Sequence, residues 1–186
     1  EAQGRIIRDI GKKAGAPFHQ DGHRSGSIEM ADRMFGLLGP DAWLSHCTDL
    51  TEADIDTLVR TGTSVVHNPS AIAAVRGHCP AIAMMDRGVT VMIGSDGTAP
   101  DRSTDMFRHM FQAMRYHQRA ARDERLLPPG KALEMITIDA ARGLGMADRI
   151  GSLEVGKDAD IITVDLTAPH MLPANMPVHR VVYFAG

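Results

Sequence analysis

Four short apolar segments of this chain each lead into a polar residue that can take part in catalysis, and helical patterns separate them. The segments are 16–19, 42–45, 64–66 and 89–97, the last of which ends in a glycine turn. The polar residues at their ends are His19, His46, His67 and Asp96. Alternating strands and helices predict an α/β fold with a parallel sheet and right-handed connections. Because the carboxyl ends of parallel strands face the same way, we expect these side chains to line one rim.

Apolar residues recur at helical spacing between the segments. We expect helices at 3–13, 27–37, 79–87 and 131–143, one that follows Thr51, and a long one capped by the loop 101–105. Thr51 and Asp54 have the spacing of a weak capping box. In the long helix, Met110 and Met114 have a spacing that is typical of a buried face.

The pattern changes near residue 150. Residues 151–160 are rich in turn formers, and 161–165 and 180–184 are typical of strands with no helix between them. We therefore predict a boundary near 150, with a first domain at 1–150 and a small β element at 151–186.

Composition and charge exclude several classes of protein. Of the 186 residues, 44% are hydrophobic and 23% are charged, which is typical of a folded globular protein. The net charge is −3 and no run of Lys and Arg occurs, so nucleic acid is not an expected partner. No apolar run is long enough to span a membrane. Cys47 and Cys79 lie in unrelated contexts, which predicts neither disulfides nor a cysteine zinc site and favours the reducing cytoplasm.

An isolated histidine is more often structural than catalytic. We expect that ordinary role for the histidines that do not follow a predicted strand: His78, His109, His117, His170 and His179. Three strand-end histidines together with a strand-end aspartate are harder to explain by structure alone, so they predict a shared site.

Several motifs together resemble the amidohydrolase superfamily. They are Leu44-Ser45-His46-Cys47, His67-Asn68-Pro69-Ser70, Gly94-Ser95-Asp96-Gly97, Asp105-Met106-Phe107, and the segment from Gly151-Ser152-Leu153 to Gly156-Lys157-Asp158-Ala159-Asp160. Within that superfamily they are most similar to the cytosine deaminase and chlorohydrolase-like branch, which includes atrazine chlorohydrolase and S-adenosylhomocysteine deaminase. The resemblance covers nearly the whole chain, in the right order and spacing.

The resemblance implies the C-terminal half, strands 5–8, of a (β/α)8 TIM barrel, followed by part of an accessory β-sandwich. It also implies one divalent metal, zinc or iron. Carried over, His19 matches the strand 5 metal ligand, with Asp21 and His23 as alternatives, and Asp96 matches the strand 8 ligand. His46 matches the strand 6 histidine beside the hydrolytic water.

In the same way, His67 matches a strand 7 histidine on the substrate side. Imidazoles and a carboxylate suit zinc, which lowers the pKa of bound water. Asp96 would then hold that water and move its proton, while His46 stabilises charge at the attacked carbon. The Cys-x-x-Cys signature of the smaller zinc deaminases is absent.

The sequence also departs from the family pattern. It contains no His-x-His motif, and Gly22 stands where a glutamate follows the strand 5 histidine. Nothing corresponds to strands 1–4, and the end of the chain falls short of the full sandwich, so we interpret the sequence as an internal fragment.

The predicted activity is hydrolytic deamination or dechlorination of a small cyclic or heteroaromatic compound. Deamination would break a carbon–nitrogen bond. One alternative is a non-catalytic half-barrel that assembles with another chain or with itself, because two ligands cannot hold a catalytic zinc tightly. Another is an imidazolonepropionase-like or dipeptidase-like amidohydrolase. We expect a homo-oligomer or a requirement for the missing N-terminal half.

Overall fold

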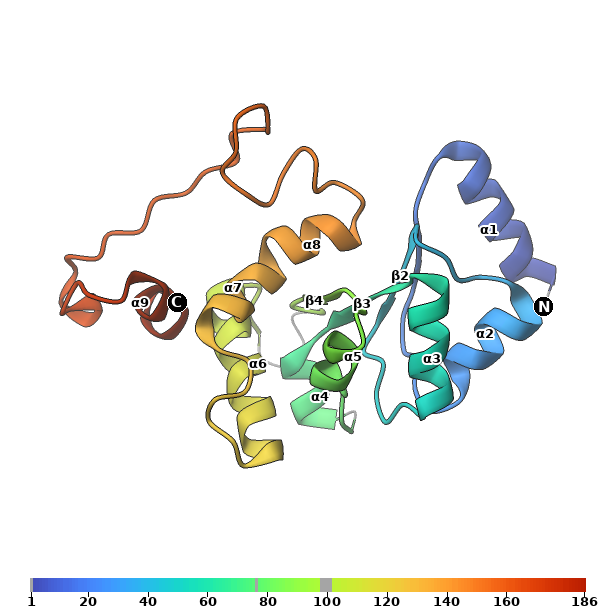
Figure 1. Cartoon of the computed structure of the whole chain (residues 1–186), viewed down its shortest axis with the longest axis horizontal. Helices are drawn as coiled ribbons and strands as arrows, with labels where there is room; N and C mark the ends of the chain where they lie inside the picture. The colour runs from blue at the N-terminus through green and yellow to red at the C-terminus, as the bar shows by residue number, and fades with distance from the viewer. Residues whose placement is uncertain (1, 76, 98–101) are drawn as a thin grey trace.

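The protein is an α/β structure built on a four-stranded parallel sheet (Figure 1). This computed structural model describes residues 2–75, 77–97 and 102–186. The strands are β1 (Phe18–Gln20), β2 (Ala42–Ser45), β3 (Ser64–His67) and β4 (Val91–Ile93), in the order β1-β2-β3-β4. Every neighbouring pair is parallel, which confirms the predicted sheet.

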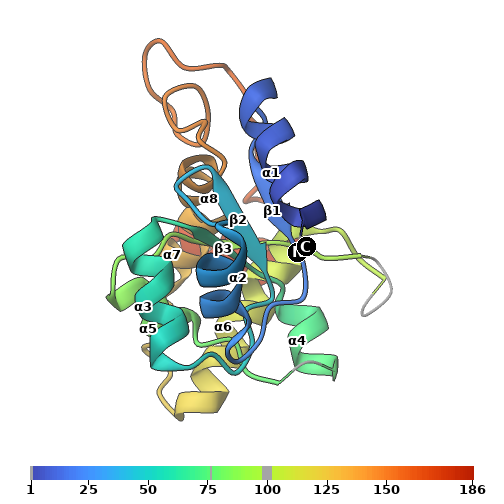
Figure 2. The ribbon, with the colours of Figure 1, turned by 90° about the vertical axis from the view of Figure 1, so that its right-hand side faces the viewer.

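Helices connect the strands and continue after them. They are α1 (Ala2–Ala14), α2 (Ser27–Phe35), α3 (Glu52–Thr61), α4 (Pro69–Val75), α5 (Ala81–Asp86), α6 (Met106–Ala121), α7 (Pro129–Ile136), α8 (Ile138–Gly143) and α9 (Pro177–Phe184), with a short 3-10 helix η1 (Pro169–Met171). Helix α1 lies beside β1 in Figure 2, where the guanidinium of Arg8 sits 5.4 Å from the ring centre of Phe18. No helix in the described part of the chain is long and apolar enough to cross a membrane.

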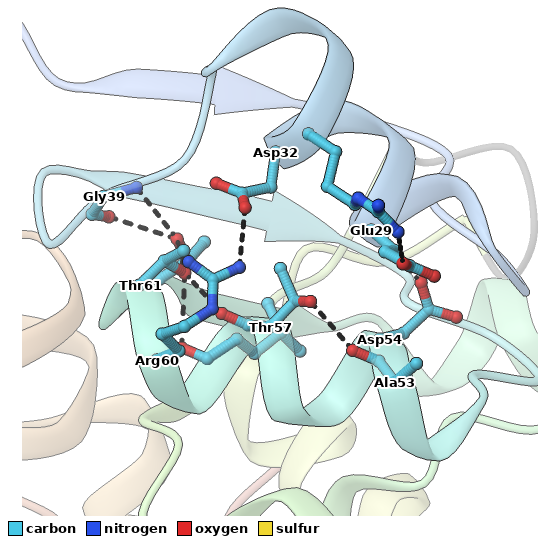
Figure 3. Close-up of polar contacts among 11 residues, drawn as sticks. Glu29, Asp32, Gly39, Ala53, Asp54, Thr57, Arg60 and Thr61 are labelled. Carbon is cyan, nitrogen blue, oxygen red and sulfur yellow. Dashed lines mark hydrogen bonds and ion pairs between the residues drawn. The ribbon is translucent and has the colours of Figure 1, made fainter.

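Asp54 of α3 lies close to Glu29 of α2 (Figure 3) and connects the two helices. Its carboxylate accepts from the N–H and hydroxyl of Thr51, which completes the predicted capping box of α3. The same carboxylate accepts from the N–H groups of Gly26 and Glu29 at the start of α2. Burial alone would raise the pKa of Asp54, but these donors together hold it below its ordinary value. One buried carboxylate thus caps two helices.

Methionines from α5, α6 and α7 are part of the hydrophobic core. Met110 and Met114 on α6 are fully buried, as their spacing predicts, and Met84 and Met135 are buried with them. The expected helix at 131–143 is divided at Thr137, whose φ of −121° and ψ of −99° separate α7 from α8. The short helix α4, which begins at Pro69 directly after β3, was not predicted.

The two strands predicted near the C-terminus are wrong. Residues 161–165 form no regular element, and 180–184 belong to α9, so the small β element is not observed within 151–186. Pro177 fits the first turn of a helix. Val182 is then buried, and the ring of Tyr183 packs edge-on against Phe111 of α6, 5.7 Å between centres. Packing on α6 therefore outweighs the strand preference of the β-branched residues.

Candidate active site

His46 follows β2 and lies at the centre of the polar rim. Its backbone N–H donates to the carbonyl of Val66 at 3.1 Å, and the residue is 1% exposed. Nε2 of the ring lies 3.0 Å from Oδ1 of Asp21 and 3.4 Å from Oδ2 of Asp96. The structure therefore brings together His46 and Asp96, both predicted from sequence, and adds Asp21. An imidazole between two carboxylates can exchange a proton with either carboxylate.

Asp96 follows β4 in a turn that depends on a close approach of two strand ends. The N–H of Gly94 donates to the carbonyl of His67 at 2.9 Å. A Cβ atom at Gly94 would lie 2.6 Å from Oδ1 of Asn68 and 2.7 Å from Cγ1 of Val66. Because only glycine fits there, Gly94 allows β4 to end against β3 and places Asp96 at the rim.

His19 lies in β1 but does not contact His46. Its Nε2 is 2.9 Å from Oγ of Ser45, and its ring stacks on Trp43 with 5.7 Å between ring centres. Asp21, two residues later, is the residue from this segment that reaches His46. The assignment of the strand 5 ligand thus stays a prediction, with Asp21 nearer to the rim pair.

His23 is buried next to the start of α2. Its Nδ1 is 2.9 Å from Oγ of Ser27, whereas its Nε2 is buried and has no hydrogen-bond partner. Burial lowers the pKa of His23, opposed by the carboxylates of Asp54 and Asp21. A neutral imidazole with one free nitrogen is the form that binds metals.

His67 ends β3 and is completely buried. Its Nε2 lies 3.2 Å from Nε2 of His117 on α6, and Nδ1 has no partner. Burial lowers the pKa of His67 well below its ordinary value, and the neighbouring His117 adds to the effect. Burial likewise lowers the pKa of His117 to about 4. Both rings are therefore neutral near pH 7.

His117 lies next to the site, although the sequence alone does not connect it with the site residues. Isolated histidines were expected to be structural, and nothing in the sequence pairs His117 with His67. The one available signal is spacing, because His117 follows Met110 by seven residues and Met114 by three, which places it on the buried face of α6.

The predicted metal ligands have the right chemistry, but the described residues do not complete a site. Imidazole nitrogens and carboxylate oxygens are zinc ligands, and the predicted ligands His19 and Asp96, with Asp21 and His23 as alternatives, provide both. Among residues 2–75, 77–97 and 102–186, however, no three or more His, Cys, Asp or Glu side chains are grouped to hold a metal ion. A structural site needs about four ligands and a catalytic site about three, so donors beyond this group are required.

The fold and the rim together define a βα protein with a histidine–carboxylate site at the carboxyl ends of parallel strands. Residues 2–183 match the profile of the Amidohydrolase family, and the chain belongs to that family.

Curated relatives are named as deaminases. A 5-methylthioadenosine/S-adenosylhomocysteine deaminase of Syntrophobacter fumaroxidans is 40% identical over 151 residues, which cover 81% of this chain and 34% of that protein. A 5'-deoxyadenosine deaminase of Methanosarcina mazei is 37% identical over 162 residues, covering 86% and 37% respectively. The chain thus spans little more than a third of these relatives.

Solved structures support the same fold. An adenosine deaminase from Xanthomonas campestris with bound zinc matches with a TM-score of 0.90 and 32% identity, covering 100% of this chain and 45% of that one. The atrazine chlorohydrolase TrzN from Arthrobacter aurescens, complexed with zinc, matches with a TM-score of 0.83 over 97% of this chain and 43% of its own. At 20% identity, the second match supports the fold alone.

Proposed function

We propose that this chain contributes part of the active site of a metal-dependent hydrolase that deaminates an adenosine-type nucleoside. The observation that carries the proposal is the position of His46 Nε2, between Asp21 and Asp96 at the ends of parallel strands. The relatives named as deaminases of 5-methylthioadenosine, S-adenosylhomocysteine and 5'-deoxyadenosine support a 6-aminopurine substrate. Dechlorination is less favoured, because the chlorohydrolase is only 20% identical.

The sheet is proposed to be strands 5–8 of a (β/α)8 barrel. Four parallel strands in sequential order support this, and so does the match to all of this chain and 45% of the adenosine deaminase. In that arrangement 1–150 belongs to the barrel, and 151–186 belongs to a second domain shared with other parts of the protein. The remaining strands come from another segment or from a second chain.

Hydrolytic deamination uses both protons of one water molecule: one ends on the departing ammonia, and the other ends on the ring nitrogen next to the carbon that keeps the oxygen. Water adds to the ring carbon that carries the amino group, the carbon–nitrogen bond breaks, and ammonia leaves. A carboxylate must take a proton from the water and a protonated group must give one to the amine. Asp96 is suited to the first role, and the His46 imidazole, 3.4 Å away, can hold the positive charge during the transfer.

The proposed cofactor is one divalent metal. Zinc is the first choice, because the adenosine deaminase and the chlorohydrolase both contain it. Zinc, when bound, lowers the pKa of a coordinated water. His19, or Asp21 or His23 in its place, and Asp96 would supply the ligands from this chain, and the others would come from outside the described group.

We also propose a cellular location and an assembly for the chain, from its cysteines and from the edges of its sheet. Two buried free cysteines, Cys47 and Cys79, favour a reducing compartment such as the cytoplasm. The edges of β1 and β4 are unpaired within the described sheet, so pairing with further strands, in a homo-oligomer or with a second segment, is proposed.

The test is ammonia release by the zinc-supplied protein in its native assembly. We expect ammonia release from S-adenosylhomocysteine, 5'-methylthioadenosine or adenosine. Asp96→Asn should abolish this release. The matched control His170→Gln changes an exposed histidine on η1 and should retain it. Chloride release from a chlorotriazine without ammonia release from any nucleoside would contradict the proposed substrate class. A zinc-loaded protein with neither activity would favour the non-catalytic scaffold.

A further inference from the structure

A buried pair of histidines connects the site to helix α6. Nε2 of His67 and Nε2 of His117 are 3.2 Å apart, and the ring centres are 4.9 Å apart. Tyr116 contacts both rings, with centres 5.8 Å from His67 and 5.0 Å from His117. The pair lies beside the rim, because the carbonyl of His67 accepts from Gly94 two residues before Asp96.

A hydrogen bond between two neutral imidazoles has only two forms. Either His67 carries its proton on Nε2 and donates, or His117 does so and His67 carries its proton on Nδ1. Burial lowers the pKa of both rings, so a doubly protonated ring is disfavoured near pH 7. The choice between the two forms therefore depends on the remaining nitrogens.

The environment of Nδ1 in His67 decides between the forms. That atom is buried and has no partner. A buried N–H without an acceptor is rarer in proteins than a buried acceptor without a donor. A proton on Nδ1 would create a buried N–H without an acceptor, which is the costlier arrangement. With the proton on Nε2, that N–H donates to His117, and Nδ1 keeps only an unpaired acceptor lone pair.

The surroundings of His117 fit the same form. Besides facing His67, His117 lines a pocket of about 360 Å³ between α5 and α6, together with Pro80, Ile82 and Ala120. Its Nδ1 is not among the buried side-chain atoms that lack a partner. A proton on that nitrogen is therefore not left both buried and without a partner, while Nε2 accepts from His67.

We propose that His117 is a positioning residue that holds His67 in the tautomer protonated on Nε2, so that Nδ1 is a fixed hydrogen-bond acceptor. A fixed acceptor suits recognition of a donor group on the ligand, such as the amino or hydroxyl groups of a nucleoside, and because Nδ1 is buried such a group has to displace the side chains that cover it. This use of His67 rests on the proposed function, whereas the tautomer itself does not.

The first test is nitrogen-15 NMR of the histidine rings in the chain, which distinguishes a protonated from a bare ring nitrogen. We expect His67 with protonated Nε2 and bare Nδ1. In His117→Leu, the two nitrogen shifts of His67 should move toward each other, because neither tautomer retains a partner. His117→Gln should keep the original pattern, since its amide oxygen can accept from Nε2. The matched control His170→Leu changes an exposed histidine on η1 and should leave the pattern unchanged.

A proton on Nδ1 of His67, or unchanged shifts in His117→Leu, would overturn the positioning role. The second readout is kcat/KM of the zinc-supplied enzyme, expected to fall about tenfold in His117→Leu, the scale of one hydrogen bond, and to recover in His117→Gln. If the shifts change as expected and kcat/KM does not, the tautomer stands and the substrate-side role of His67 in the proposed function fails.

Discussion

His46 and Asp96 meet across a strand that separates them in the sheet. They follow β2 and β4, with β3 between, yet Nε2 of His46 is 3.4 Å from Oδ2 of Asp96. Both residues have left-handed backbone conformations, with φ of 68° and 61°. That conformation costs a residue other than glycine about 1–2 kcal/mol. Such strained conformations cluster at functional sites, and here both residues of the pair have one.

The proposed catalytic role of Asp96 gives the first prediction. Asp96→Asn keeps the shape of the side chain but removes the charge that accepts a proton, so turnover should be abolished while the protein remains folded. Turnover is measured by ammonia release, and folding by circular dichroism. Near-normal turnover would disprove both the metal assignment and the proton-transfer role of this carboxylate.

The second prediction separates catalysis from metal binding at His46. His46→Ala should lower turnover by about two or more orders of magnitude, the scale of a positioned acid or base. Metal content, measured by elemental analysis of the same preparation, should be unchanged. If the metal is lost together with activity, His46 is a ligand and the assignment needs revision.

The third prediction concerns the close approach at Gly94. Gly94→Ala should lower the free energy of unfolding by about 1–3 kcal/mol, because the added methyl group overlaps Asn68 and Val66. Gly130→Ala is the matched control, since its Cβ would meet nothing within 4 Å and it lies in α7. There we expect stabilisation by about 0.5–1 kcal/mol. Urea unfolding of both variants checks the difference, and equal stabilities would show that β3 and β4 adapt.

The fourth prediction concerns the pH dependence of stability through Asp54. Its pKa in the folded chain lies below the ordinary 3.8, so its contribution is present above that value and is lost as the pH falls through the lower, folded pKa. Asp54→Asn should cost about 2–4 kcal/mol at pH 7, because several charge-assisted hydrogen bonds are weakened.

The Asp54 variant should also flatten the acid limb of the stability curve. Asp32→Asn is the control, since it removes an ion pair with the largely exposed Arg60, and a cost below about 1 kcal/mol is expected. Similar losses in the two variants, measured by urea unfolding between pH 3 and pH 7, would argue against a special role for Asp54.

Local sequence patterns predict the strands and their polar ends well. Thr51 and Asp54 predict the start of α3, and the segment at 42–45 coincides with β2, because the capping residues and apolar runs act locally. The meeting of His46 with Asp96 also follows from topology, since parallel strands end at one edge.

Features that depend on distant packing are not predictable in this way. The helix α9 replaces an expected strand because Tyr183 packs on Phe111, a contact more than seventy residues away in sequence. The contact of Asp21 rather than His19 with His46 depends on the orientation of the chain after β1. The pairing of His67 with His117 joins a strand to a helix fifty residues later, and no sequence motif encodes it.

The claim that this chain provides only part of a metal site is tested most directly by the zinc content of the 186-residue chain, measured together with its mass in solution. The account predicts well under one zinc per monomeric chain, because no group of three or more His, Cys, Asp or Glu side chains among the described residues is arranged to hold a metal ion. One tightly held zinc per monomer would contradict it and would show that this chain completes the site alone.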